Sequence, residues 1–271
     1  MSYTADRRGG RAAGSGACNT PGVSVEGRVA LVTGAGGRGM GRSIALTLAR
    51  DGADVVLNYR ARQERAAAVV AAVESLGRRA LPFAADVSDA DAVDAMFAAA
   101  RARFGRVDIV VNSAGGPWKP QDITEIAPAH LRAVLAEEIE ATVLLLRAAL
   151  PEMRRQGWGR FISIGGYLAD DWRFGPPEAP LDYPLGKAAR HWLTRTLGPR
   201  ELAHGVTVNA IAPGPTPPVS LDDALAALRG GRRGRAGNTP PDVAEVAAFL
   251  CSDEAVRITG AVIPLPGATA V

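Results

Sequence analysis

The stretch VALVTGAGGRGMGRSIA, residues 29–45, decides how this chain folds. It joins a short β-branched run at 29–33 to a glycine-rich turn, and the turn leads into an amphipathic helix from about residue 40. Glycines in such a turn let backbone N–H groups approach a pyrophosphate, which the N-terminus of the following helix stabilises. Glycines alone would be weak support, but a strand before them and a helix after them predict a dinucleotide-binding turn.

The rest of the chain repeats this strand-then-helix order. The strand-like runs are nearly continuous in apolar residues, which is typical of strands covered on both faces. They lie at 29–33, 54–59, 80–85, 107–112, 160–165, 206–212 and 261–265. Helical patterns lie near 40–51, 62–76, 89–104, 129–155, 184–203 and 241–252. The alternation predicts an α/β fold, a single-domain, Rossmann-like, doubly wound parallel sheet of about seven strands.

Composition divides the chain into a tail and one domain. Residues 1–26 are rich in Gly, Ala, Ser and Arg and predict a flexible N-terminal tail. Residues 27–271 are long enough for one dinucleotide-binding domain. Within that domain, the poorly patterned residues 213–240 predict a substrate flap. The basic run at 229–235 is interpreted as a solvated part of this flap, and contact with phosphates or an acidic substrate is the alternative.

Charge and cysteine content exclude several classes of partner. The net charge is +3, and two of these units arise within the first dozen residues, so a nucleic-acid partner is not expected. No apolar run reaches the ~18 residues of a membrane span. Cys18 and Cys251 lie far apart, and no His/Cys cluster indicates a metal site. We therefore expect a cytoplasmic protein that acts on a small molecule.

Six motifs follow one another in a fixed order along the chain. They are TGAGGRGMG at 33–41, ADV at 85–87, VNSAG at 111–115, YPLGK at 183–187, NAIAPG at 209–214 and ITG at 258–260. With these motifs the chain resembles the short-chain dehydrogenase/reductase family over residues 28–267, although its glycine loop is about one residue longer than usual. The resemblance implies a homo-oligomer, a dimer or tetramer, with helices 129–155 and 184–203 in the interface.

The resemblance also assigns cofactor contacts. The turn would hold the pyrophosphate, Asp86 and Val87 the adenine edge, and residues after the fourth strand the ribose side. The nicotinamide end would meet residues that follow the sixth strand. Besides Asp86, Val87, Tyr183 and Lys187, these contacts comprise Gly34, Arg38, Gly39, Met40, Gly41, Asn112, Ala114, Gly115, Pro213, Gly214 and Thr216.

The end of the second strand bears on the choice between NAD and NADP(H). A carboxylate there would accept the ribose hydroxyls of NAD and repel a 2′-phosphate. This chain instead has Asn58, Tyr59 and Arg60, and Arg38 lies in the glycine loop. Two arginines near the 2′ position favour NADPH over NAD, and the alternative is that both are solvated surface charges.

Tyr183 and Lys187 are four residues apart, which places them on one face of a helix. In the family that this chain resembles, the tyrosine is the general acid, and the lysine lowers its pKa and binds the nicotinamide ribose. A neighbouring ammonium favours phenolate and so lowers the pKa of a phenol. We expect a catalytic pair, and two ordinary helical neighbours are the alternative.

Two other members of the family's catalytic tetrad are altered. The usual serine aligns with Gly166, next to Tyr167, whose hydroxyl is a candidate substitute. The usual helix asparagine aligns with Glu138, which falls inside an apolar stripe. A carboxylate on a buried face needs a partner. We expect Glu138 to pair with Lys187 or to face the substrate, unless a local register shift exposes it to solvent.

These features predict an NADPH-dependent oxidoreductase that transfers a hydride to a C=O or C=N group, with a biosynthetic role in specialised metabolism left open. Because Gly166 offers no hydroxyl to a carbonyl, an iminium or activated carbonyl is the expected acceptor. Trp118 and Trp172 would line the substrate pocket with Gly166 and Tyr167. The alternatives are a cyclase or isomerase without net redox, and a non-catalytic NADPH-binding protein. His191 is expected to pack or to face solvent.

Overall fold

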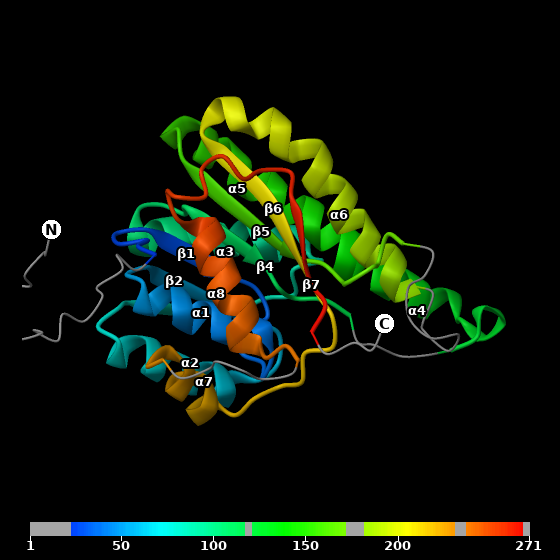
Figure 1. Ribbon diagram of the computed structural model, residues 1–271, viewed down its shortest axis with the longest axis horizontal. Helices are drawn as coiled ribbons and strands as arrows, with labels where there is room; N and C mark the ends of the chain where they lie inside the picture. The colour runs from blue at the N-terminus through cyan, green and yellow to red at the C-terminus, as the bar shows by residue number, and fades with distance from the viewer. Residues whose placement is uncertain (1–22, 117–120, 172–181, 231–236, 268–271) are drawn as a thin grey trace, which may run out of the picture.

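The computed structural model describes residues 23–116, 121–171, 182–230 and 237–267. Its centre is a parallel sheet of seven strands in the order β3-β2-β1-β4-β5-β6-β7 (Figure 1). The strands are β1 (Val29–Val32), β2 (Asp54–Tyr59), β3 (Ala80–Ala84), β4 (Ile109–Asn112), β5 (Gly159–Ile164), β6 (Val206–Pro213) and β7 (Val262–Leu265). This confirms the prediction of a doubly wound parallel sheet.

Helices cover both faces of the sheet because successive strand residues point to opposite sides. Ala30 and Val32 enter one core, whereas Val29 and Leu31 enter the other. The first core also contains Val25, which the sequence analysis assigned to the tail. It is covered by α1 (Met40–Arg50), α2 (Gln63–Ser75) and α8 (Pro240–Cys251), and the second by α3 (Ala90–Phe104), α5 (Ala141–Gln156) and α6 (Asp182–Glu201).

The helix expected over 129–155 changes register in its middle. It consists of α4 (Pro128–Leu135), a π-helical turn η2 (Ala136–Glu140) and α5. Such a turn adds a residue to the helix and is frequent at functional sites. A local register shift, considered above as the alternative that would expose Glu138, is therefore present, but it leaves Glu138 fully buried.

The region 213–240 contains a helix that the sequence analysis missed. α7 (Leu221–Leu228) follows the end of β6 and lies against α1. Its signal was a Ser220–Asp223 cap, in which the Ser220 hydroxyl accepts the Asp223 N–H at 3.0 Å. The remaining short 3-10 helices are η1 (Ile123–Glu125) and η3 (Leu202–His204).

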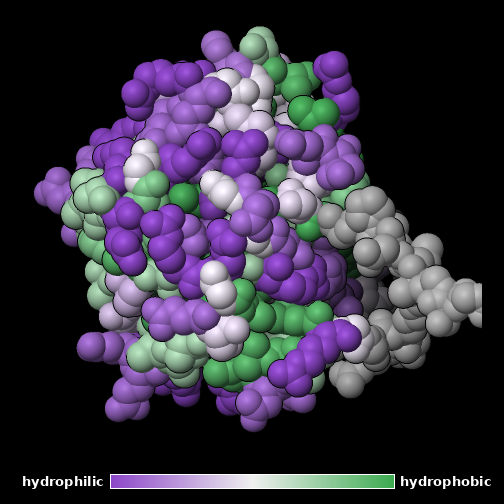
Figure 2. Space-filling model, turned by 90° about the vertical axis from the view of Figure 1, so that its left-hand side faces the viewer, coloured by the Kyte–Doolittle hydropathy of each residue, from purple (hydrophilic) through white to green (hydrophobic). Residues whose placement is uncertain are grey.

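The site residues gather at the carboxyl ends of the strands, as expected for an open parallel sheet. In Figure 1 the carboxyl end of β6 runs towards α4 and the start of α6. The face at the left of that view is mostly hydrophilic, and its most extensive apolar area lies in the lower part (Figure 2). Across the described ranges, none of the helices combines the length and the apolar character that a bilayer crossing requires.

Candidate active site

The glycine turn brings backbone segments into direct contact. Gly34 has a φ of +67°, and a Cβ at Gly41 would lie 2.8 Å from the carbonyl oxygen of Thr33. Both positions therefore require glycine. Gly39 is the N-cap of α1, Met40 is its first residue, and no described side chain caps this terminus. The first N–H groups of α1 thus remain available to an anion, so the turn fits a pyrophosphate.

Asn58 and Tyr59 support the turn from the end of β2. The Asn58 side chain is buried; its amide nitrogen donates to the Ala85 carbonyl at 3.0 Å, and its oxygen accepts the Gly34 N–H at 3.3 Å. Tyr59 packs against Gly36, where a Cβ would lie 2.7 Å from the Tyr59 Cβ. Asn58 therefore braces the turn against β3.

Arg60, expected near the 2′ position of the cofactor, already has two acidic neighbours. Its guanidinium lies 2.5 Å from Glu137 Oε1 and 3.6 Å from Asp86 Oδ2. Glu137, the larger influence, and Asp86 raise the pKa of Arg60. The Asp86 carboxylate also accepts the Ser88 N–H at 3.0 Å and the Ser88 hydroxyl at 2.7 Å. Arg60 is thus neutralised by carboxylates in this structure.

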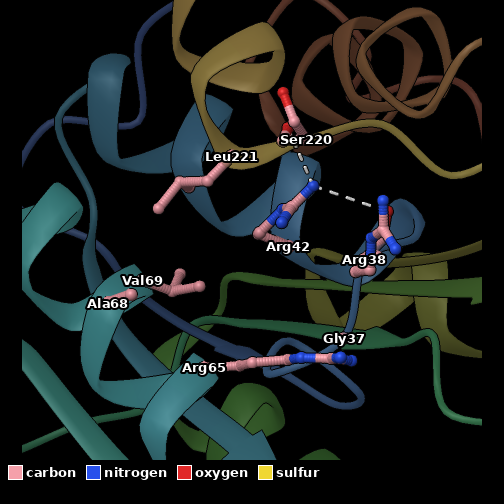
Figure 3. A pocket seen from close by; sticks show the side chains of 8 residues that line it. All are labelled: Gly37, Arg38, Arg42, Arg65, Ala68, Val69, Ser220 and Leu221. Carbon is pink, nitrogen blue, oxygen red and sulfur yellow. Dashed lines mark hydrogen bonds between the residues drawn. The ribbon is translucent and has the colours of Figure 1, made fainter.

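A cavity of about 330 Å³ lies beside the glycine turn (Figure 3). Three arginines from the turn, α1 and α2 contribute to it, together with the start of α7. The lining residues are Gly37, Arg38, Arg42, Arg65, Ala68, Val69, Ser220 and Leu221. Arg42 and Arg65 were not singled out by the sequence analysis, because nothing in the sequence shows that α1, α2 and α7 converge here.

The cavity carries positive charge that the described residues do not neutralise. Arg42 is buried and donates to the carbonyl oxygens of Val219 at 2.5 Å and Ser220 at 3.0 Å. Burial, and then repulsion by Arg38 and Arg65, lower the pKa of Arg42. No carboxylate in the described ranges pairs with Arg38 or Arg65, and the Arg42 Nε has no hydrogen-bond partner there. The cavity therefore suits an anion.

The remaining expected cofactor contacts lie at the ends of β4 and β6. Asn112 is buried and donates to the Thr142 hydroxyl at 2.8 Å. The Thr216 hydroxyl donates to the Gly214 carbonyl at 2.9 Å, and the Pro213 carbonyl accepts the Tyr167 N–H at 3.0 Å. Val87 is buried after β3. All of these residues follow strands at the same edge of the sheet.

Tyr183 and Lys187 lie on one face of α6, as expected. The Lys187 Nζ lies 5.3 Å from the centre of the Tyr183 ring and donates to the Ile164 carbonyl at 3.4 Å. Burial lowers the pKa of Lys187 to about 8, whereas burial and then Glu138 raise the pKa of Tyr183 to about 12. The second shift is opposite to the lowering expected from Lys187, because burial and the carboxylate act in the other direction.

Glu138 is fully buried beside this pair. Its Oε2 lies 3.0 Å from Lys187 Nζ and 2.9 Å from Arg190 Nε, and its Oε1 accepts the Gly116 N–H at 2.9 Å. The structure confirms the expected pairing with Lys187. Two glycines make room for the carboxylate: a Cβ on Gly115 would lie 2.5 Å from Glu138 Oε1, and one on Gly186 2.5 Å from Glu138 Cβ.

Arg190 is the site residue that sequence reasoning missed. It lies three residues beyond Lys187 on α6, and its side chain is fully buried. Its guanidinium donates to backbone carbonyls after β4, at the end of β5 and in η2, among them Ala114 at 2.7 Å and Ile164 at 2.9 Å. The signal was a charged residue on the same helix face as Lys187, complementary to Glu138.

At Gly166, which the sequence analysis aligned with the usual serine, a Cβ would fit only if its neighbour shifted slightly. A Cβ on Gly166 would lie 3.3 Å from Lys187 Cγ, whereas one on Gly165 would lie 2.2 Å from His191 Nε2. His191 is buried and packs under these glycines, and its Nδ1 lies 3.2 Å from Asp170. Its ring therefore packs, one of the two expected roles. Trp118 and Trp172 lie outside the described residues.

Comparison with known proteins gives a consistent result. A family profile described as "Enoyl-(Acyl carrier protein) reductase" matches residues 34–267. Cyclohexanol dehydrogenase from Rhodococcus is 34% identical, with 92% of this chain and 98% of that protein covered. The 3-oxoacyl-[acyl-carrier-protein] reductase FabG of Staphylococcus aureus is 35% identical, with 88% and 96% covered.

Solved structures agree with the sequence relatives. A short-chain dehydrogenase from Burkholderia cenocepacia in complex with NADP is 32% identical, with a TM-score of 0.77 and coverage of 90% of this chain and 99% of that chain. The glycine turn, the Tyr183–Lys187 pair and the seven-stranded sheet thus occur in a chain whose relatives are oxidoreductases. The protein belongs to the short-chain dehydrogenase/reductase family of oxidoreductases.

Proposed function

We propose that the protein is an NADPH-dependent reductase that transfers a hydride to a small-molecule C=O or C=N group. The observation that carries this proposal is the contact between the two halves of the site. A Cβ on Gly115 would lie 2.9 Å from Lys187 Nζ, and the neighbouring Ala114 backbone lies 3.2 Å from the Cβ position of Gly34. A dinucleotide held by the glycine turn would therefore extend towards Tyr183 and Lys187.

The cofactor supplies the hydride, and the residues of this chain supply binding and the proton. Gly34, Gly39 and Gly41 with the N-terminus of α1 would hold the pyrophosphate. Lys187 would hold the nicotinamide ribose. The Tyr183 hydroxyl would give its proton to the oxygen of a carbonyl as it is reduced, or to the nitrogen of a neutral imine, which thereby becomes the iminium that accepts the hydride. The raised pKa of Tyr183, about 12, keeps this phenol protonated at neutral pH. That protonation state favours reduction over oxidation.

The arginine cavity supports NADPH over NADH. Arg38 and Arg65 have no carboxylate partner among the described residues, whereas Arg60 contacts Glu137 and Asp86. A phosphate group would gain charge-assisted hydrogen bonds from unpaired guanidinium groups more readily than from a neutralised one. We therefore assign the 2′-phosphate to the cavity, with Arg38 and Arg65 as its donors, and not to Arg60.

Gly166 supports an acceptor that is already electrophilic. Losing one oxyanion donor typically lowers the rate by ~10²–10³. An iminium needs no such donor, because it becomes neutral when the hydride arrives. Glu138, in contrast, gives little support to a cationic substrate, since its carboxylate is buried and shared by Lys187 and Arg190. Gly166 alone therefore carries the preference for an iminium or an activated carbonyl.

The test is NADPH consumption, followed by absorbance, against matched cyclic imines and ketones. We expect oxidation of NADPH with the imines in preference to the ketones, and its loss in Tyr183→Phe. Preference for ketones would contradict the iminium assignment. Substrate turnover without a change in absorbance would replace the reductase by a cyclase or isomerase. Binding of NADPH without turnover of any substrate would indicate a non-catalytic protein.

Assembly and location remain predictions. The exposed apolar side chains Val143 on α5, and Leu185 and Trp192 on α6, support a homo-oligomer formed through these helices. Light scattering that gives the mass of a monomer would contradict this. A cytoplasmic location also stays a prediction.

A further inference from the structure

Two charges of opposite sign are buried next to Lys187. Glu138 and Arg190 have fully buried side chains, and the Arg190 Nε lies 2.9 Å from Glu138 Oε2. The same carboxylate oxygen lies 3.0 Å from Lys187 Nζ. A buried carboxylate needs compensating positive charge, and here two cations share one of its oxygens. The three groups therefore behave as one electrostatic unit.

We propose that Glu138 and Arg190 act as a compensated ion pair that positions Lys187 and sets its charge, with Arg190 as a positioning residue. The two charges of the pair cancel, so the unit carries the same net charge as Lys187 alone. The role of this unit in catalysis rests on the proposed function, whereas the ion pair itself does not.

The backbone around the pair holds it in a fixed place. Arg190 donates to carbonyl groups at the ends of β4 and β5 and in η2, so its guanidinium cannot follow Glu138 if the carboxylate moves. Gly115 and Gly186 leave a space that fits the carboxylate, and the Gly116 N–H binds its second oxygen. A site built from three separate elements in this way positions Glu138 against Lys187.

The members of the pair act on Lys187 in opposite directions. The pKa of Lys187 is lowered to about 8, because burial and then Arg190 lower it more than Glu138 raises it. Removing Glu138 should therefore lower the Lys187 pKa, and removing Arg190 should raise it. Other charged groups around α6 are Glu137, which is paired with Arg60, Asp182, which is paired with His130, and His191, which is paired with Asp170.

The sequence offers a direct readout, because the chain contains only two lysines, Lys119 and Lys187. In protein labelled with ¹³C at the lysine ε-carbon, each lysine gives one NMR signal whose shift reports its protonation. Lys119→Arg assigns the two signals. The measurement needs neither substrate nor cofactor, so it is independent of the proposed function. Turnover assays that fail with every substrate would overturn the proposed function and leave the titration unaffected.

The experiment titrates Lys187 in the wild type and in variants of the pair. We expect a wild-type midpoint near pH 8. Glu138→Gln should lower it by about one pH unit or more, and Arg190→Met should raise it. The double variant, which removes one charge of each sign, should return towards the wild-type value. The matched control is Glu137→Gln, the same change one residue earlier, which should move the midpoint least.

Several results would overturn the proposal. The first is that the Lys187 midpoint does not move in Glu138→Gln. The second is that the midpoint moves in the same direction in both single variants. If the single variant Arg190→Met does not fold, the double variant is compared with Glu138→Gln. The Lys187 midpoint must then be higher in the double variant. With a substrate in hand, kcat/KM at neutral pH should fall in Glu138→Gln and recover in the double variant.

Discussion

Glycines serve different purposes in the two halves of the site. In the glycine turn they let backbone meet backbone: the Cβ position of Gly41 lies 2.8 Å from the Thr33 carbonyl. Around Lys187 they let side chains enter: the Cβ positions of Gly115 and Gly186 lie 2.5 Å from atoms of Glu138. The first use serves a bound dinucleotide, and the second serves a buried ion pair.

The difference teaches what each half of the site depends on. Backbone contacts in the turn depend on local sequence and follow the expected motif. The other half depends on tertiary contacts, because Glu138 and Arg190 come from different helices and are buried together beside Lys187. Variants at glycines of both kinds can therefore separate the two halves.

The largest effect is expected at the turn. Gly41→Ala would push a methyl group against the Thr33 carbonyl, so NADPH affinity should fall on the order of 100-fold and the melting temperature should drop. Gly39→Ala is the control for the fold, because nothing lies within 4 Å of its Cβ position. Fluorescence titration measures the NADPH affinity of each variant, and thermal unfolding measures its melting temperature. Equal melting temperatures for the two variants would contradict the backbone contact.

The next effect is a gain of activity. Gly166→Ser should raise kcat/KM for ketones by about 100-fold, because the added hydroxyl can polarise a carbonyl and its Cβ needs only a small shift of Lys187 Cγ. Gly165→Ser is the matched control, since its Cβ would collide with His191. Steady-state kinetics with ketones measures the effect. A folded Gly166→Ser variant with no gain in kcat/KM would contradict this prediction.

A smaller effect separates the arginines. Arg65→Ala should raise the KM for NADPH about tenfold, because a charge-assisted hydrogen bond to phosphate contributes about 1.5–3 kcal/mol. Its KM for NADH should stay unchanged. Arg60→Ala should affect NADPH less, as Arg60 is bound to Glu137. The cavity assignment fails if Arg60→Ala has the larger effect.

The smallest effect tests the space around the ion pair. Gly115→Ala should reduce kcat/KM roughly tenfold, because overpacking of this kind typically costs about 1–3 kcal/mol. Glu138→Ala removes the side chain that the new methyl group would meet, so Gly115→Ala should cost less in that background. Equal losses in both backgrounds would mean that Gly115 does not make room for Glu138.

The sequence predicted the sheet and its order of elements well. Continuous apolar runs are typical of strands covered on both faces, and the helical patterns between these runs indicate the helices that cover them. It missed α7, because the apolar repeat of this helix spans only eight residues within a stretch rich in Gly, Pro and Arg. The apolar stripe predicted that Glu138 is buried, but a stripe on one helix cannot identify Arg190 on another. Glu137 and Arg60 are 77 positions apart, so their pairing depends on tertiary structure.

A crystal structure with NADP⁺ bound tests the central claim most directly. We predict the nicotinamide ring beside the Tyr183 hydroxyl, with the ribose on Lys187 and the 2′-phosphate in the cavity of Arg38 and Arg65. A nicotinamide ring turned away from Tyr183, or a 2′-phosphate bound by Arg60 alone, would contradict it.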